Sequence, residues 1–331
     1  MAIREELCRR ERTETPPQHV SHAVVKVAAA VILRHDGQVL LAQRPPGKVY
    51  AGYWEFPGGK LEAGESARDA LDRELHEELG LTVTRAAPWL VRRYVYEHAH
   101  VELHFFRVLA FTGEPAGHDG QAFAWQDPHR FTVAPLLPAN APIIAALQLP
   151  TIYGITMASD VGEVAFLARL ERALDAGLRL VQVREKEWEI ARLQAFTERV
   201  LALAQRFGAR VLLNGTVEQA RAWGYDGVHW TSAALARAVE RPAHLMCGAS
   251  CHSADEIARA GELGLDFVVL GPVGPTPSHP HASPLGWGTF EERVQRTRVP
   301  VFALGGVRVR DIHVAIDHGA HGVALRSGAW R

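Results

Sequence analysis

The chain has 331 residues, of which 47% are apolar and 22% are charged, and its formal net charge is -1. This length exceeds one average domain and the composition is that of an ordinary globular protein, so we expect two domains of roughly 150 to 200 residues. The near-zero charge excludes a global attraction to nucleic acid or to an anionic membrane, so any phosphate binding must be local.

The cysteine content and the apolar runs narrow the class of protein further. Three cysteines are too few for a disulfide framework, which favours a reducing compartment, so we expect a cytoplasmic protein. Every apolar run is shorter than the roughly 18 residues that a membrane-spanning helix needs, so no membrane partner is expected. Residues 1–20 are polar and are expected to form a loose tail.

The first half combines short apolar runs with one amphipathic helix. Two runs rich in Val and Ile flank Asp36-Gly37, which predicts a hairpin turn. Apolar side chains at helical spacing follow, and Gly80 is expected to end that helix. The expected elements are strands at 24–33, 38–43, 82–96 and 101–111 and helices at 67–79 and 141–147.

From Pro150 onward, strand-like runs alternate with stretches of helical periodicity. Parallel strands need a crossover helix between each pair, so eight such runs predict a (βα)₈ TIM barrel, with a doubly wound α/β sheet as the alternative. The runs are 151–156, 179–183, 210–213, 227–229, 244–249, 267–270, 301–304 and 322–325. We therefore predict an N-terminal domain at 21–149 and a barrel domain at 150–331.

A cluster of carboxylates lies on the predicted helix of the first half. Glu74, Glu77 and Glu78 stand at i, i+3 and i+4, so they share one helix face within about 6 Å of one another. Such crowding is unfavourable in a bare helix, whereas Mg²⁺ or Mn²⁺ would cancel the repulsion by binding hard oxygen ligands. A solvated acidic face is the alternative, and the preceding Gly58-Gly59 turn favours the metal site.

The segment from Gly59 to Leu81 resembles the signature of the Nudix hydrolases position for position. The resemblance implies an α/β/α sandwich with a mixed sheet, bound Mg²⁺ or Mn²⁺, and an ion pair between a loop glutamate and a helix arginine. It leaves open which glutamate is the general base. The residues to which it assigns catalytic or metal-binding roles are Glu65, Arg73, Glu74, Glu77 and Glu78, with a backbone carbonyl of Gly58 or Gly59.

Outside that signature, the first half is similar to the MutT subfamily, the 8-oxo-dGTP diphosphatases. The resemblance implies that Arg44 lies at the nucleotide, that Glu55-Phe56-Pro57-Gly58 lines the base pocket, and that Asn140 reads the purine edge. An amide presents a donor and an acceptor side by side, which suits oxidised guanine, while a helix N-cap is the alternative role for Asn140. Asp119 replaces the glutamate expected as a further metal ligand, and Ala99 replaces an arginine near the base.

Several segments of the second half, most of them at or just beyond the predicted strands, resemble the thiamin phosphate synthase and TenI (thiazole tautomerase) family. Barrel enzymes keep their active sites at the C-terminal ends of their strands. The matching segments are 182–186, 226–229, 248–253, 271–273, 276–278 and 303–307. The implied ligand is a thiazole or a thiamin phosphate, and the candidate site residues are Arg184, Lys186, His252, Gly305, Gly306 and Ser327.

The barrel segment departs from the synthases where they bind Mg²⁺. Asn214-Gly215-Thr216 and Trp230-Thr231-Ser232 stand where the synthases carry acidic residues, and His279 replaces a lysine. Without these groups a pyrophosphate leaving group is hard to stabilise, so we expect no synthase activity. His252 matches the TenI histidine, which suits a proton shuttle, with a plain loop histidine as the equal alternative.

Three functions follow from these resemblances. The chain is a diphosphatase that converts 8-oxo-dGTP to the monophosphate and pyrophosphate, which cleans the nucleotide pool and so serves DNA repair, and the barrel is not catalytic. Alternatively it is bifunctional, with thiazole tautomerase activity, or its first domain hydrolyses a diphosphate of the thiamin pathway. Arg44 and Asn140 favour the first reading, and the fusion hints at the last. In each case the partners are small molecules, with no direct contact to nucleic acid.

Overall fold

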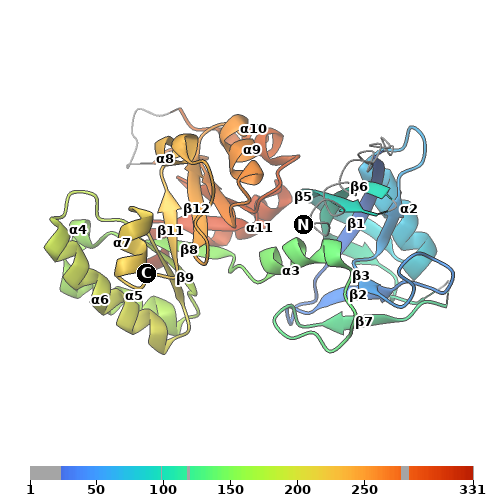
Figure 1. The fold of residues 1–331 in the computed structure, drawn as a ribbon, viewed down its shortest axis with the longest axis horizontal. Helices are drawn as coiled ribbons and strands as arrows, with labels where there is room; N and C mark the ends of the chain where they lie inside the picture. Colours follow the sequence, from blue (N-terminus) through green and yellow to red (C-terminus); the bar gives the residue numbers. More distant parts are fainter. Residues whose placement is uncertain (1–23, 98, 118–119, 277–282, 331) are drawn as a thin grey trace, which may run out of the picture.

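The computed structural model describes residues 24–97, 99–117, 120–276 and 283–330. Figure 1 shows two bodies side by side, an N-terminal part built on a mixed sheet and a C-terminal closed barrel. The predicted fold class is therefore confirmed, and the barrel excludes the doubly wound alternative. None of the helices in this described part combines the length and the apolarity that crossing a membrane requires.

The N-terminal part contains two small sheets with one helix on each side. One sheet has the order β4-β1-β6-β5, with β1 and β6 parallel and the other pairs antiparallel, and the second has the order β3-β2-β7. Its strands are β1 (Val25–Ile32), β2 (Val39–Gln43), β3 (Trp54–Glu55), β4 (Gly58–Lys60), β5 (Thr82–Tyr96), β6 (Ala99–Thr112) and β7 (Phe123–Gln126). Its helices are α2 (Ala67–Leu79), η2 (Pro138–Asn140) and α3 (Ala141–Leu147).

The turn predicted at Asp36-Gly37 forms, but the two flanking strands do not make a hairpin. Gly37 takes a left-handed φ of 82° and donates to the Arg34 carbonyl. Across the turn the Arg34 amide donates to the Gln38 carbonyl at 2.9 Å and a bridge joins Leu33 to Val39, but the pairing does not extend into the two strands. The reason is that β1 already pairs with β4 and β6 on its two edges, while β2 pairs with β3 and β7. The two strands therefore separate into different sheets.

Helix α2 spans the predicted range because its local signals agree. Ser66 caps the first turn by accepting from the Asp69 amide, and Gly80 ends the helix with a left-handed φ of 66°. Leu71 and Leu75 are fully buried against the β1–β6 sheet, in the same cluster as Phe106. Glu74 and Glu78 flank this buried face and are half-buried, whereas Glu77 is exposed.

The barrel closes in the order β10-β11-β12-β13-β14-β15-β8-β9, with all strands parallel. Its strands are β8 (Ile152–Ile155), β9 (Leu180–Val183), β10 (Arg210–Leu213), β11 (Gly227–Trp230), β12 (Met246–Cys251), β13 (Phe267–Leu270), β14 (Val301–Leu304) and β15 (Gly322–Leu325). β12 starts later than expected because His244 has a left-handed φ of 61°, which does not fit a strand.

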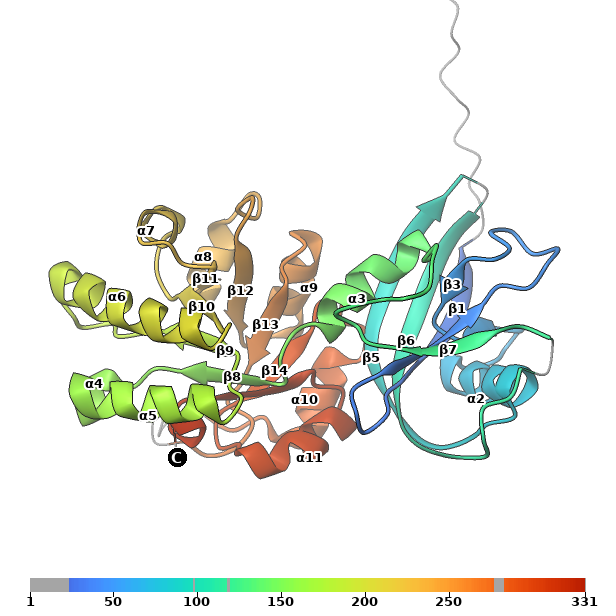
Figure 2. The ribbon, with the colours of Figure 1, turned by 90° about the horizontal axis from the view of Figure 1, so that it is seen from below.

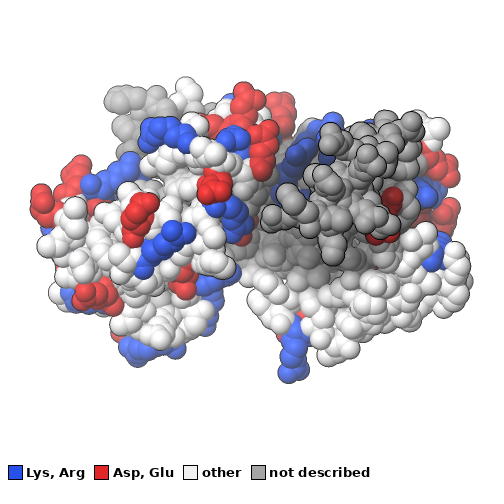
Figure 3. All heavy atoms as spheres, in the orientation of Figure 1, with Lys and Arg blue, Asp and Glu red and all other residues white. Residues whose placement is uncertain are grey.

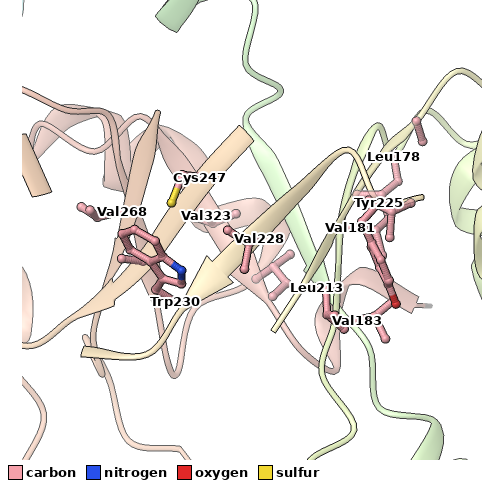
Figure 4. Close-up of a cluster of buried hydrophobic side chains, with 14 of the residues drawn as sticks. Leu178, Val181, Val183, Leu213, Tyr225, Val228, Trp230, Cys247, Val268 and Val323 are labelled. Atoms are coloured by element: carbon pink, nitrogen blue, oxygen red, sulfur yellow. The ribbon is translucent and has the colours of Figure 1, made fainter. Parts of the chain in front are cut away.

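Helices surround the barrel and cover the outward side chains of its strands. Figure 4 shows Val181, Val228 and Cys247 within this outer layer. Cys247 and Cys251 are free and buried there, as expected of strand cysteines. The helices are α4 (Ala158–Val161), α5 (Glu163–Asp175), α6 (Ile190–Arg206), α7 (Val217–Ala222), α8 (Ser232–Arg237), α9 (Ala254–Glu262), α10 (Gly286–Val294), η3 (Val309–Asp311), α11 (Ile312–Asp317) and η4 (Gly328–Trp330).

The N-terminal part contacts the barrel through β5 and β6 (Figure 2). The Val91 amide donates to the Thr297 carbonyl at 2.8 Å, and Arg107 is hydrogen-bonded to His321. Thr297 and His321 precede β14 and β15, so the contact lies at the N-terminal ends of the barrel strands. The C-terminal mouth of the barrel, where its candidate residues lie, is at the opposite end.

Candidate functional site

Two glycines hold the loop before α2 close to the helix glutamates. Gly58 has a φ of 144°, and a Cβ there would lie 2.1 Å from the Ala28 carbonyl oxygen. A Cβ on Gly59 would lie 2.0 Å from the carboxyl carbon of Glu74. Only glycine fits at Gly58, because the clash there is with backbone. At Gly59 a Cβ would displace the end of the Glu74 side chain, so the loop backbone and the Glu74 carboxylate are in direct contact.

Arg73 organises the acidic face of α2. Its guanidinium makes a two-pronged contact with Glu65 at 2.9 and 3.0 Å and also contacts Glu74 at 2.9 Å and Glu77 at 3.3 Å. It further donates to the Lys60 carbonyl at 3.1 Å. The hydrogen bond from Arg73 lowers the pKa of the Glu65 carboxyl. The ion pair expected between Arg73 and Glu65 is therefore present, and it ties the loop to the helix.

Glu78 carries the strongest electrostatic perturbation among these glutamates. Burial, with the nearby Glu74 and Glu55 carboxylates adding to it, raises the pKa of Glu78 to about 7. Lys48 and the backbone N–H of Gly58 oppose that rise. The positive charge of Lys48 therefore offsets only part of the effect of burial and of the neighbouring carboxylates.

The side chains of the three helix glutamates do not point toward one common site in this structure. Glu74 and Glu77 contact Arg73, while Glu78 faces the loop at Gly58. Within the described ranges, no group of three His, Cys, Asp or Glu side chains is arranged to hold a metal ion. The donor set nevertheless fits a divalent cation, because it supplies hard oxygens and because Lys48 offsets the Glu78 charge only in part. Glu78, Glu74 and the Gly58-Gly59 carbonyls would hold it.

The predicted substrate residues fall into two groups. Arg44 contacts Glu55 at 2.6 Å and the Val49 carbonyl at 2.8 Å, and burial raises the pKa of Glu55. Asn140 is buried, makes no side-chain cap to α3, and donates from Nδ2 to the Trp54 carbonyl at 3.2 Å. Its alternative role as an N-cap is therefore wrong, and the side chain is anchored next to β3.

Phe56 and Pro57 anchor the loop between β3 and β4 to the core. Phe56 is buried in the core and meets Phe105 edge to face, with ring centroids 5.7 Å apart. The Pro57 carbonyl accepts from the Ala30 amide at 2.8 Å. Both residues thus fix the position of the loop through contacts with β6 and β1. The predicted ligand Asp119 lies outside the described residues.

Sequence reasoning missed an aromatic group beside Glu55. Ring centroids of Tyr50 lie 5.2 Å from Tyr53 and 5.4 Å from Tyr96, and those of Tyr94 and Tyr96 lie 4.5 Å apart. Burial, with the Glu55 charge adding to it, raises the pKa of Tyr96 to about 12. These rings come from the β2–β3 loop and from β5, so no local spacing signals their proximity.

At the barrel mouth the structure brings three cations close enough to interact. Burial and the nearby Arg326 lower the pKa of Arg184, and Arg184 in turn lowers that of Lys186. Arg326 contacts Asp160 at 2.7 Å. Acidic and basic side chains lie interspersed on the barrel face seen in Figure 3. An anion at the mouth would relieve the local repulsion between the three cations.

The other candidates of the barrel surround the same end. Gly305 and Gly306 follow β14 with left-handed φ values of 87° and 69°, and Ser327 is exposed in the turn after β15. The Gly305 carbonyl accepts from the Gly274 amide at 2.9 Å. His252 follows β12, and its Nδ1 lies 3.0 Å from the Gly271 carbonyl. In the described part of the chain, His252 is hydrogen-bonded to Glu256, Gly271 and Arg293 rather than to the three cations.

The barrel mouth does not fit the Mg²⁺ that the synthases use. Gly215 and Thr231 offer no carboxylate after β10 and β11. Glu185 is acidic and lies after β9, but both its oxygens accept from the first amides of α4, at Ala158 and Ser159. Thr231 caps α8 by accepting from the Ala234 amide. His279 lies outside the described residues.

Comparison with known proteins divides the chain at the same place as the fold. A family model for the NUDIX domain matches residues 28–146, and one for thiamine monophosphate synthase matches residues 152–329. The first part is similar to the CTP pyrophosphohydrolase of Escherichia coli, with 43% identity over 38% of this chain and 92% of that protein. It is also similar to the 8-oxo-dGTP diphosphatase of Haemophilus influenzae, with 37% identity over 38% of this chain and 91% of the relative.

The second part is similar to the putative thiamine-phosphate synthase 2 of Aquifex aeolicus. The two are 36% identical over 180 residues, which covers 54% of this chain and 96% of the relative. The matches cover almost the whole of each relative and agree with the mixed-sheet part and the closed barrel. The chain therefore belongs to the Nudix family through residues 28–146 and to the thiamine monophosphate synthase family through residues 152–329.

Proposed function

We propose that the Nudix part hydrolyses a nucleoside triphosphate to the monophosphate and pyrophosphate with a divalent cation, Mg²⁺ or Mn²⁺. The observation that carries the proposal is the Glu78 carboxyl, whose pKa is raised to about 7 beside Glu74 and under the Gly58-Gly59 turn. Such a group is expected at a site built for cationic charge or for proton transfer. When bound, the cation neutralises phosphate and leaving-group charge.

The side chains of the acidic face have separate roles in the proposed hydrolysis. Water attacks phosphorus, a P–O bond to the water oxygen forms, the bond between the α- and β-phosphates breaks, and a carboxylate takes the water's proton. Arg73 holds Glu74 toward the loop and ties Glu65 to the helix. Glu77, which is the most exposed of the set, completes the acidic face. The catalytic roles of these residues are part of the proposal.

The favoured substrate is 8-oxo-dGTP, and CTP is the second candidate. The first rests on Arg44 and on Asn140, whose amide is fixed next to β3 by the Trp54 carbonyl. The second is favoured by the Escherichia coli relative that is named for CTP. Both bases would meet the Arg44–Glu55 pair and the tyrosine rings of Tyr50 and Tyr96.

Hydrolysis rates separate these candidates. The full chain is assayed with Mg²⁺ on 8-oxo-dGTP, dGTP, CTP and thiamin diphosphate, with Glu78→Gln as the inactive control. A clear preference for 8-oxo-dGTP over dGTP supports the first candidate, and a preference for CTP supports the second. Comparable rates on all four compounds contradict both, and a preference for thiamin diphosphate selects the thiamin-pathway reading.

For the barrel we propose binding of a phosphorylated ligand, such as a thiazole or thiamin phosphate, without synthase activity. The support is the group of cations Arg184, Lys186 and Arg326 together with the missing carboxylates after β10 and β11. Thiazole tautomerisation through His252 remains the second candidate, because an exposed histidine at the mouth can move a proton. Formation of thiamin phosphate from its two precursors would refute the loss of synthase activity.

A further inference from the structure

Two arginines from different domains lie close together at the domain junction. The Val91 amide of β5 donates to the Thr297 carbonyl at 2.8 Å, so β5 runs beside the turn that links α10 to β14. Arg92 follows Val91 and Arg298 follows Thr297, so each side of this contact supplies one guanidinium. Burial, with the Arg298 charge adding to it, lowers the pKa of Arg92. The two positive groups are therefore close enough to repel each other.

Both guanidiniums lack a partner within the described part of the chain. Arg92 is half-buried, and its buried Nε has no hydrogen-bond acceptor there. The stem of Arg298 lies over α9, where a Cβ on Gly261 would be 3.1 Å from the Arg298 Cβ, and its guanidinium has no hydrogen bond or ion pair with a described residue. Glu262, the neighbour of Gly261, is already paired with Arg259 at 3.2 Å. Buried donors are normally paired, so Arg92 needs an acceptor that these residues do not supply.

The surroundings of the pair do not supply the missing negative charge. Arg93 and Arg296 flank the pair, and both contact the buried carboxylate of Glu102, at 2.8 and 3.3 Å. His104 also contacts Glu102 at 3.2 Å, and burial lowers the pKa of that histidine. The carboxylate of Glu102 therefore serves the two flanking guanidiniums. The charges of the central pair stay unmatched among the described residues.

From this geometry we propose that the junction binds a multiply charged oxyanion of the phosphate class, held between Arg92 and Arg298 so that it bridges the two domains. Two unmatched positive charges favour an anion with at least two negative charges over chloride or a monocarboxylate. A guanidinium presents a planar fork of donors that matches phosphoryl oxygens, and the Nε of Arg92 gains the acceptor that it lacks.

This anion site is distinct from the two sites proposed above. The turn that contains Arg298 precedes β14, at the N-terminal end of the barrel, whereas Arg184 follows β9 at the C-terminal mouth. On the Nudix side, Arg92 belongs to β5 and the acidic face belongs to α2. Because the bound anion replaces repulsion across the junction by attraction, it should stabilise the arrangement of the two domains. The proposal depends on neither proposed activity.

The Nε–H signals of arginine in ¹H–¹⁵N spectra report on each guanidinium separately. The full chain is titrated with inorganic pyrophosphate in metal-free chloride buffer, and the variants Arg92→Gln, Arg298→Met and Arg184→Ala identify the three signals. We expect the signals of Arg92 and Arg298 to shift together with one common affinity. A shift of Arg184 without a shift of Arg92 would overturn this proposal and leave the anion site at the barrel mouth intact.

Two variants of similar length separate the charge of Arg298 from its packing. Arg298→Met should weaken pyrophosphate binding at Arg92 about tenfold, as for lost hydrogen bonds to a charged group, while Arg298→Lys should retain most of it. Without pyrophosphate the Met variant should have the higher melting temperature, because the repulsion is gone. With pyrophosphate this order should reverse, which a purely structural role of Arg298 does not predict. Arg237→Gln, an exposed change on α8, is the control and should behave as the wild type.

Three further results would each contradict a specific part of the proposal. Equal pyrophosphate affinity in Arg298→Met and in the wild type would show that the anion does not bridge the domains. If acetate at the same ionic strength stabilised the chain as much as pyrophosphate, the preference for a multiply charged anion would be wrong. A melting temperature of Arg298→Met below that of Arg298→Lys in anion-free buffer would contradict the repulsion between the two arginines.

Discussion

Arg107 of β6 and His321 before β15 form a buried contact between the two domains. Arg107 donates from Nη1 to the His321 carbonyl at 3.0 Å and from Nη2 to Nδ1 at 2.9 Å. His321 Nε2 lies 3.0 Å from the Leu149 carbonyl, so the ring carries its proton on Nε2 and accepts at Nδ1. The Trp89 ring stacks on the His321 ring, and the centroid of the Trp89 ring lies 4.3 Å from the guanidinium carbon of Arg107.

Arg107→Ala should destabilise the junction between the domains. It removes two hydrogen bonds and leaves two buried acceptors on His321 unpaired, so we expect a loss of about 2 kcal/mol. The matched control is Arg85→Ala, which breaks an exposed ion pair with Asp317 and should change stability by about 0.5 kcal/mol or less. Thermal unfolding of both variants measures the difference, and equal effects would show that the buried contact contributes little.

Acid should weaken the barrel through its buried histidines. Burial lowers the pKa of both His229 and His321 to about 3, against 6.5 for the free side chain. The unfolded chain therefore binds more protons in this range, so stability falls as the pH drops from about 6.5 toward 3. The slope of stability against pH should be shallower in His321→Gln than in the wild type. The exposed His313→Gln is the control, and an identical slope in all three proteins would refute the assignment.

Glu78 should act on stability in the opposite sense. Its folded pKa of about 7 exceeds the ordinary value of 4.5, so the folded chain binds more protons and loses stability as the pH rises through this window. In metal-free buffer Glu78→Gln should therefore be more stable than the wild type at pH 8, by on the order of 1 to 3 kcal/mol, and similar to it at pH 4. A divalent cation should stabilise the wild type more than the variant at pH 8.

The same variant should lose hydrolysis. Removing the proposed metal ligand is expected to lower kcat/KM by about a hundredfold or more, since even outer-shell partners cost tenfold or more. Glu198→Gln, which changes an exposed glutamate of α6, should keep full activity. Retained activity in Glu78→Gln would refute the proposed site, and a loss in both variants would point to a general folding defect.

The two loop glycines should respond differently to alanine. Gly58→Ala places a Cβ against backbone and strains a φ of 144°, so we expect a loss of stability on the order of 3 kcal/mol. Gly59→Ala meets only the end of the Glu74 side chain, so the fold should survive while activity falls about tenfold or more. Melting temperature and kcat/KM distinguish the two, and a fully active Gly59→Ala would remove Glu74 from the proposed site.

The sequence by itself determined the elements that depend on near neighbours. The Ser66 cap, the helical spacing of apolar residues and Gly80 place α2 as predicted, because helix hydrogen bonds and caps join residues a few positions apart. Alternating strands and helices also predicted the barrel, since short crossovers enforce parallel pairing. Helical periodicity also placed Glu74, Glu77 and Glu78 on one helix, whereas the ion pair between Arg73 and Glu65 was implied by the Nudix resemblance.

Only the tertiary structure decided which distant residues meet. Pairing on both edges of β1 separated it from β2, and burial brought Arg107 to His321, 214 positions away. A chain of hydrogen bonds from Tyr153 through His229 to Ser250 likewise joins separate strands of one closed barrel. These contacts depend on which strands neighbour one another and on the loss of water around them, and local spacing carries no information on either.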